Sequence, residues 1–266
     1  MTKQLNLLLE DSFRFYRERR LKKALNTAQI ALEFGKNHLS ENHGLFQVHL
    51  LLSNIYNTNG LYKNDTAFYA KALSALDDVK KNYPLAELSE LSADLLIARG
   101  RICHNLRAFD QSRQLFEEAL EISSKLEHTK CLVKSYAGLG QISLALNDPE
   151  ATIELGKQIE TVLKRANEPV KSQLWSDMYL LFSQAFILKQ EYSRSLEMSQ
   201  ALLEISRQTK DIEKEVIALR NIAVVCGVKS NYKIGMLYFL EALDKCESIG
   251  YRELTVQIHI NIATLY

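Results

Sequence analysis

Three histidines that lie close together in the sequence, His38, His43 and His49, could do metal chemistry, because imidazole is a common metal ligand. Their spacings of five and six residues put them on different faces of a helix, or on the two sides of a loop. A zinc site needs ligands that converge on one point. We therefore interpret these histidines as structural or solvent-facing residues and expect no metal site.

Cysteine chemistry is no better indicated. The four cysteines, Cys103, Cys131, Cys226 and Cys246, are far apart and form no CxxC pair, which argues against a disulfide framework or a zinc finger. We expect Cys103 and Cys226 to be small buried side chains rather than nucleophiles. The sequence contains no GxxxxGK, GxGxxG, GxSxG or HExxH motif. We therefore expect a protein that is not an enzyme and needs no cofactor.

The composition is typical of a helical chain with a substantial core. Of its 266 residues, 47% are hydrophobic, and only 3 are proline and 10 glycine. The formal net charge of +1 predicts no broad attraction to nucleic acid or to anionic membranes. We find no signal peptide and no segment of membrane-span length in the sequence. These features favour a cytoplasmic location.

A repeated unit runs along the whole sequence. Each copy has a first helix rich in small and apolar residues, a short turn, and a second helix. The turn-plus-second-helix segments are RRLKKALNTAQIAL (19–32), GLYKNDTAFYAKAL (60–73), RAFDQSRQLFEEAL (107–120), NDPEATIELGKQIE (147–160), QEYSRSLEMSQALL (190–203) and SNYKIGMLYFLEAL (230–243).

One aligned position in these segments is mostly aromatic, and a short side chain follows it three residues later. The aligned pairs are Leu21 and Ala24, Tyr62 and Asp65, Phe109 and Ser112, Pro149 and Thr152, Tyr192 and Ser195, and Tyr232 and Gly235. Antiparallel helices approach closely only where the side chains between them are small. The pattern therefore predicts stacked helix pairs with a period of about 40 residues.

This pattern resembles the tetratricopeptide repeat, most clearly in GLYKND and FYAKAL, in SYAGLGQISLALNDPEA and in RGRICHNLRAFDQSRQLFEEAL. The resemblance covers essentially the whole chain, although the usual period of the family is about 34 residues. It implies an all-α fold, a right-handed superhelical solenoid of stacked antiparallel helix pairs with a concave inner wall.

Helix signals agree with this register. Pro84, Pro149 and Pro169 are each expected in the first turn of a helix, with Asp148 as an N-cap. We expect one solenoid, 1–266, of six helix pairs plus an unpaired seventh first helix at 251–266. The predicted helices are 3–17, 20–36, 43–58, 62–82, 85–106, 109–126, 129–146, 149–165, 169–189, 192–208, 211–229, 232–248 and 251–266.

In proteins with this repeat, partners bind mostly in the groove formed by the first helices of successive units. The resemblance therefore implies a concave partner-binding wall here. Its polar residues would be Asn54, Asn57, Arg101, His104, Asn105, Lys134, Gln141, Gln184 and Arg220. Amide side chains offer a donor and an acceptor to a peptide backbone, and Arg101, Lys134 and Arg220 could hold a carboxylate. We reject the family's clamp for chaperone tails, because only Asn54 and Arg101 match it partially.

Two other features are interpreted as structural. The only tryptophan, Trp175, is expected to be a packing residue rather than a ligand platform. The basic run RERRLKK at 17–23 is expected to be a solvated turn, with contact to an anion or an acidic partner as the alternative.

The last helix, which ends in HINIATLY, is apolar on more than one side. The end of a solenoid usually turns a polar face outward. We therefore expect 1–266 to be the N-terminal part of a longer protein. The face that would be covered by its continuation or by a second copy comprises Leu254, Ile258, Ile262, Leu265 and Tyr266.

Three functions are compatible with the sequence. The leading hypothesis is a non-catalytic module that binds a protein or peptide, as the sensory or regulatory part of a larger signalling protein. The first alternative is a homo-oligomerisation module, dimeric through its C-terminal helix. It would control an output domain (DNA-binding, cyclase, diguanylate cyclase or kinase) beyond residue 266. The second, by resemblance to the Rap/PlcR-like group, is a sensor of a small ligand or peptide. In none of them does this segment itself bind nucleic acid or a membrane.

Overall fold

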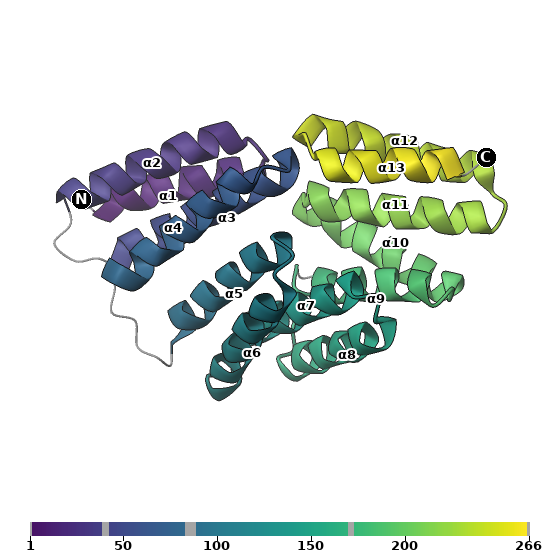
Figure 1. Cartoon of the computed structure of the whole chain (residues 1–266), viewed down its shortest axis with the longest axis horizontal. Helices are drawn as coiled ribbons and strands as arrows, with labels where there is room; N and C mark the ends of the chain where they lie inside the picture. The colour runs from purple at the N-terminus through teal and green to yellow at the C-terminus, as the bar shows by residue number, and fades with distance from the viewer. Residues whose placement is uncertain (1, 39–42, 83–88, 170–172, 265–266) are drawn as a thin grey trace.

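The computed structural model of the chain describes residues 2–38, 43–82, 89–169 and 173–264, which form thirteen α-helices and no strand (Figure 1). Both the all-α class and the number of helices are as predicted. The helices are α1 (Thr2–Arg17), α2 (Leu21–His38), α3 (His43–Lys63), α4 (Thr66–Asn82), α5 (Glu90–Asn105), α6 (Phe109–Lys125), α7 (Thr129–Ala145), α8 (Pro149–Arg165), α9 (Trp175–Leu188), α10 (Tyr192–Thr209), α11 (Ile212–Val228), α12 (Tyr232–Ile249) and α13 (Arg252–Thr264).

The helices form two layers. The odd-numbered helices α1 to α11 contact one another in succession and form a continuous inner layer, whereas the even-numbered helices pack mainly on their odd-numbered neighbours. Because the inner helices are packed more closely than the outer ones, the array curves. It curves so far that α13 contacts α3, and these two helices approach each other in the upper part of Figure 1.

The short side chains of the repeat lie where paired helices approach each other. Ser112 Oγ donates a hydrogen bond to the backbone oxygen of Gly100, and Ser195 Oγ donates one to that of Ser183, both at 2.8 Å. All four atoms are buried in the contact between two helices, so the hydroxyl groups replace water as partners of these carbonyls. Small size is therefore combined with a hydrogen bond from the side chain of one helix to the backbone of the other.

The predicted alignment is wrong by one helical turn in the second unit. Tyr62 lies in the last turn of α3 rather than at the start of α4, which begins at Thr66. The chain turns at Asn64, which has a left-handed conformation (φ 52°), and Asp65 accepts a hydrogen bond from the amide of Ala67. Gly60 lies within α3 and does not end it. Its lack of a side chain makes room for the ring of Tyr69, since a methyl group there would lie 2.7 Å from Tyr69 Cε1.

The prolines gave mixed results as helix signals. Pro149 occupies the first turn of α8, and Asp148 caps that helix by accepting a hydrogen bond from the Ala151 amide at 2.9 Å, as predicted. Pro169 instead lies in the connection before α9, which begins only at Trp175. Pro84 is outside the described residues.

The last helix packs more fully than its sequence suggests. Leu254 and Ile258 are buried in the apolar cluster that also contains Leu219 and Phe239, so these two residues do not form a free face. Ile262 is half-buried, and the apolar side chains that α13 exposes are Val256 and Ile260, each 57% exposed. The predicted face is therefore corrected to the opposite side of the helix. Leu265 and Tyr266 are outside the described residues.

Candidate functional site

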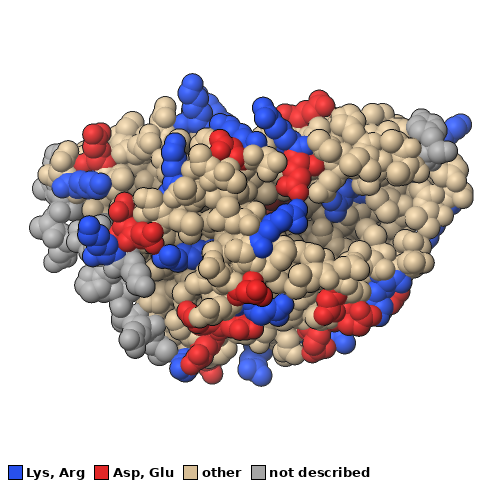
Figure 2. All heavy atoms as spheres, in the orientation of Figure 1, with Lys and Arg blue, Asp and Glu red and all other residues tan. Residues whose placement is uncertain are grey.

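The nine polar residues predicted for the concave wall lie on five consecutive helices of the inner layer. Arg101 is exposed, Asn57 is buried, and the others are half-buried. Figure 2 shows that this face of the molecule is hollowed near its centre, where acidic and basic side chains gather. The residues are Asn54 and Asn57 on α3, Arg101, His104 and Asn105 on α5, Lys134 and Gln141 on α7, Gln184 on α9, and Arg220 on α11.

Three of these residues form one polar cluster between α3 and α5. Asn105 Nδ2 donates a hydrogen bond to Asn57 Oδ1 at 3.0 Å, and Asn105 Oδ1 lies 3.5 Å from His104 Nδ1. The Gln141 backbone is close to the imidazole, but His104 Nε2 is enclosed with no partner in hydrogen-bonding geometry among the described residues. Burial lowers the pKa of His104, so its ring is neutral at physiological pH.

The lysine of the wall is partly neutralised within the chain. Lys134 Nζ lies 3.8 Å from Asp94 Oδ1, an oxygen that also has Cys131 Sγ at 3.8 Å. Burial lowers the pKa of Lys134, and the positive charge of Arg101 lowers it further. The negative charge of Asp94 raises it. Lys134 is therefore less available to an external anion than the sequence suggested.

Gln184 contributes an acceptor without a partner. Its Oε1 atom is enclosed by the protein and accepts no hydrogen bond within the described part of the chain. The preceding residue, Ser183, accepts a hydrogen bond from Asn221 Nδ2 at 3.1 Å and so connects α9 to α11. An acceptor that is left unpaired in an enclosed place costs about 1–3 kcal/mol.

Arg220 connects α11 to α13 through neutral groups. Its Nε and Nη2 atoms donate to Asn221 Oδ1 at 3.3 and 3.1 Å, and Nη1 donates to Gln257 Oε1 at 3.0 Å. Burial lowers the pKa of Arg220, and the nearby Tyr251 acts in the opposite direction.

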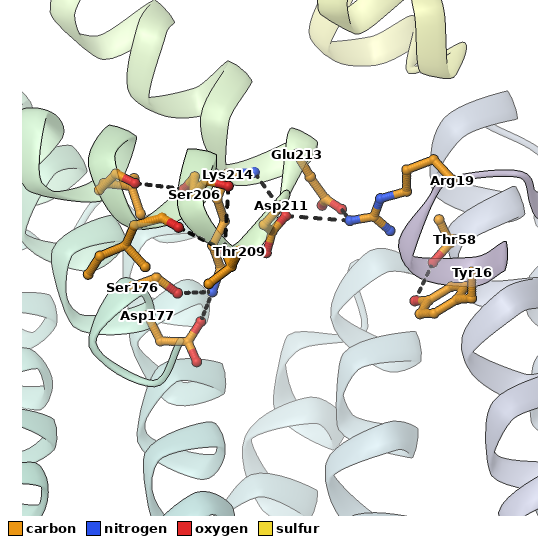
Figure 3. Close-up of polar contacts among 12 residues, drawn as sticks. Tyr16, Arg19, Thr58, Ser176, Asp177, Ser206, Thr209, Asp211, Glu213 and Lys214 are labelled. Carbon is orange, nitrogen blue, oxygen red and sulfur yellow. Dashed lines mark hydrogen bonds and ion pairs between the residues drawn. The ribbon is translucent and has the colours of Figure 1, made fainter. Parts of the chain in front are cut away.

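An ion-pair cluster joins the two ends of the solenoid (Figure 3). Arg19, in the turn between α1 and α2, donates from Nη2 to Glu213 Oε2 at 3.1 Å and lies 3.6 Å from Asp211 Oδ1. The Arg19 and Glu213 side chains are only 13% and 28% exposed. Burial alone would lower the pKa of Arg19, but Glu213 and its other neighbours outweigh this effect and raise it. The guanidinium is therefore held in its charged form.

Aromatic rings complete this contact. Tyr62 of α3 stacks on Tyr251, which precedes α13, with ring centroids 4.9 Å apart. Arg19 lies over the rings of Tyr16 and Tyr62, and Tyr16 exchanges a hydrogen bond with Thr58. We call Arg19, Tyr62, Asp211, Glu213 and Tyr251 the closure contact.

The closure contact corrects our interpretation of the basic run at 17–23. Arg19 is not a solvated residue, because its partners are carboxylates of the same chain, of which Glu213 lies 194 residues away. No local pattern in the sequence could have indicated this pairing. Its neighbour Arg20 is exposed, as predicted for the run as a whole.

Trp175 is buried, as expected of a packing residue, but it also borders a cavity of about 400 Å³ between α8, α9 and α10. Tyr179, Phe182 and Phe186 form part of its apolar wall, and Arg194 lies over the Phe186 ring. The Trp175 indole already donates to the backbone oxygen of Glu168 at 3.3 Å. The cavity is therefore lined mostly by packing residues and lies outside the predicted wall.

The cysteine and histidine side chains that could be reactive have the following environments. Cys103 is buried and Cys226 half-buried, and burial raises the pKa of both thiols. His49 is buried, whereas the side chains of His38 and His43 are outside the described part. The described residues contain no cluster of three or more histidine, cysteine, aspartate or glutamate side chains suited to a metal ion.

Known proteins share the architecture of this chain. Residues 93–126, which span α5 and α6, match the model of the tetratricopeptide repeat. A Rap protein in complex with Competence and Sporulation Factor superposes on 100% of this chain and 71% of its own, with a TM-score of 0.70 and 14% identity. The chain is a tetratricopeptide-like solenoid. At this level of identity the likeness establishes the fold.

Other solved solenoids superpose less well. The apo form of RapI reaches a TM-score of 0.61 at 13% identity, over 98% of this solenoid and 70% of its own chain. A putative kinesin light chain from Podosopora anserina, with nearly identical repeats, reaches 0.52 at 13% identity, over 78% and 97%. Among curated proteins, no sequence matches this solenoid. None of its described helices is both long and apolar enough to cross a bilayer.

Proposed function

We propose that the solenoid is a non-catalytic module that binds a short peptide along its inner wall. The observation that carries the proposal is the enclosed Gln184 Oε1, an acceptor without a partner on a helix of that wall. An amide N–H of a bound peptide backbone would satisfy it once the Gln184 side chain turns its amide toward the inner wall, which would remove the cost of leaving the oxygen unpaired. Asn54, Asn57, His104, Asn105 and Gln141 would provide further donors and acceptors on the same layer.

Affinity selection from a library of random short peptides tests the proposal. The solenoid should retain peptides, and Gln184→Ala should weaken binding about tenfold, the effect of losing about 1.4 kcal/mol. Gln158→Ala is the matched control, because Gln158 is exposed on the outer helix α8. Failure of the parent to retain any peptide, or equal weakening by both substitutions, would contradict the proposal.

We further propose that the module is the sensory part of a regulatory protein. Support comes from the Rap protein whose structure contains Competence and Sporulation Factor and superposes on the whole chain. In such a sensor, peptide binding would change the curvature of the inner layer. Small-angle scattering with and without a selected peptide should show a change in radius of gyration, and an unchanged radius would argue for a rigid scaffold instead.

The surface of α12 and α13 favours a second candidate function, self-association. Leu237 is 67% exposed, and Val256 and Ile260 are each 57% exposed. Exposed apolar side chains in such numbers are typical of interaction surfaces. If a second copy covers this surface, light scattering should give a dimer mass that Leu237→Lys reduces to that of a monomer.

A further inference from the structure

One cation on the inner wall differs from the others in its partners. Six lysine and arginine side chains of the described residues are half-buried: Arg19, Arg99, Lys134, Lys214, Arg220 and Lys245. Five of them lie within 4.0 Å of a carboxylate, namely Glu213, Asp77, Asp94, Asp177 and Glu215 in the same order. Arg220 has no such carboxylate among the described residues. A sheltered charge is normally paired, so this one requires an explanation.

The hydrogen bonds of Arg220 hold the guanidinium in place without neutralising it. Asn221 and Gln257 together accept from three of its N–H groups, through neutral amide oxygens. A guanidinium has five N–H groups, so one remains on each terminal nitrogen. These two donors are sufficient for both oxygens of a carboxylate, the geometry in which arginine binds anions most strongly.

The position of Arg220 is accessible to a ligand of the inner wall. It lies two turns after Glu213 on α11, so both residues share one face of the helix. Glu213 reaches across the closure contact to Arg19 and is not available to Arg220 (Figure 3). Gln257 approaches from α13, and the side chain of Arg220 remains partly exposed to solvent between the two helices.

We propose that Arg220 is the receptor for a carboxylate of the bound peptide. The inference rests on the proposed function and specifies its ligand as a peptide with a carboxylate, either at its C-terminus or on an acidic side chain. Asn221 and Gln257 act as positioning residues that fix the guanidinium. Because the site is sheltered, the ion pair is weakened less by solvent and salt than one on an open surface.

Three synthetic peptide libraries of the same length distinguish the two sources of the carboxylate. The first has a free C-terminus and no acidic residue, the second an amidated C-terminus with one glutamate or aspartate at a random position, and the third an amidated C-terminus with no acidic residue. Binding of each is measured to the parent, to Arg220→Gln, and to Arg99→Gln. The last is a matched control that removes another half-buried arginine, one that is paired with Asp77.

We expect the parent to prefer the first or the second library over the third by about tenfold to a hundredfold. Arg220→Gln should remove this preference while still binding the third library, and Arg99→Gln should retain it. Circular dichroism of each variant verifies folding. A variant Arg220→Lys, which keeps the charge but loses the fork, should retain only part of the preference.

The failures are distinguishable. If the parent binds all three libraries equally, the carboxylate inference is wrong and the proposed function stands. If Arg220→Gln keeps the preference of the parent, Arg220 is not the receptor. If no library binds, the proposed function fails and the inference fails with it.

Discussion

At the scale of single residues, close packing depends on glycines that accommodate aromatic rings. The buried ring of Phe116 on α6 lies against Gly100 of α5 and Gly138 of α7. A methyl group at Gly138 would overlap the ring, whereas one at Gly100 would lie 3.0 Å from Phe116 Cζ. The ring therefore sets how closely three helices approach one another.

We expect Gly138→Ala to lower the free energy of unfolding by about 1–3 kcal/mol, because overpacking a filled interior forces its neighbours to move. Gly100→Ala should cost less, since its methyl group needs only a small shift. Adding Phe116→Leu to Gly138→Ala should reduce the effect of the glycine substitution. Urea unfolding of the three variants measures these differences, and a neutral Gly138→Ala would contradict the packing described.

Buried histidines predict the pH dependence of stability. Burial lowers the pKa of His49 and of His104 below the value of about 6.5 in an unfolded chain. The unfolded chain therefore binds protons that the folded chain rejects, and the contribution to stability is lost as the pH falls through about 6.5. Above that pH it is fully present.

The expected result is a fall in the free energy of unfolding between about pH 7.5 and pH 5.5, with a shallower fall in His104→Gln. His259→Gln is the control, because His259 is exposed on α13. Urea titrations at several pH values test this. Identical slopes for the parent and His104→Gln would exclude His104 as a source of the pH dependence.

At the scale of one helix, α8 is the best-defined element. Its N-cap Asp148 accepts from the Ala151 amide, Pro149 follows in the first turn, and Lys164 and Arg165 lie in the last turn. The negative charge at the start and the positive charges at the end both complement the helix dipole.

Asp148→Ala should destabilise the protein by about 0.5–2 kcal/mol, because an amide of the first turn loses its partner. Asp148→Asn should cost much less, since asparagine also caps helices well. Thermal unfolding followed by circular dichroism compares the two. Equal losses for both variants would indicate that the charge, rather than the cap, stabilises α8.

At the scale of the whole molecule, the closure contact distinguishes this solenoid from an open spiral. The inner helices hold the curvature locally, and among the described residues Arg19 and Tyr62 join the beginning of the chain to the start of α11 and to the turn before α13. Because a solenoid is otherwise stabilised by contacts between neighbouring units, we expect this long-range contact to control the width of the hollow.

Arg19→Ala should open the curved solenoid. The radius of gyration in small-angle scattering should increase, and the free energy of unfolding should fall by about 1–3 kcal/mol. Arg20→Ala should leave the radius unchanged, since the contacts of Arg20 with the exposed Glu18 and with the Phe15 ring are local. If Arg19→Ala has the radius of gyration of the parent, then the local curvature of the inner helices alone brings α3 and α13 together.

The sequence by itself determined the helices and their pairing. Short side chains such as Ser112 and Ser195 recur at fixed spacing, and caps such as Asp148 mark where helices begin, because both depend on local chemistry. The same regularity placed the polar residues of the wall on the inner helices. The prediction that a helix begins at Tyr62 failed. In the sequence, a glycine such as Gly60 that makes room for an aromatic ring cannot be distinguished from one that ends a helix.

Only the tertiary structure decided which charges are neutralised. Arg19 and Arg220 are both arginines next to polar residues in the sequence, yet among the described residues one meets two carboxylates from a distant part of the chain and the other meets none. The partners of Arg19 depend on the curvature accumulated over the successive helix contacts from α2 to α11, a sum that no local pattern encodes. For the same reason, the side of α13 that is buried is decided by the helices that pack against it.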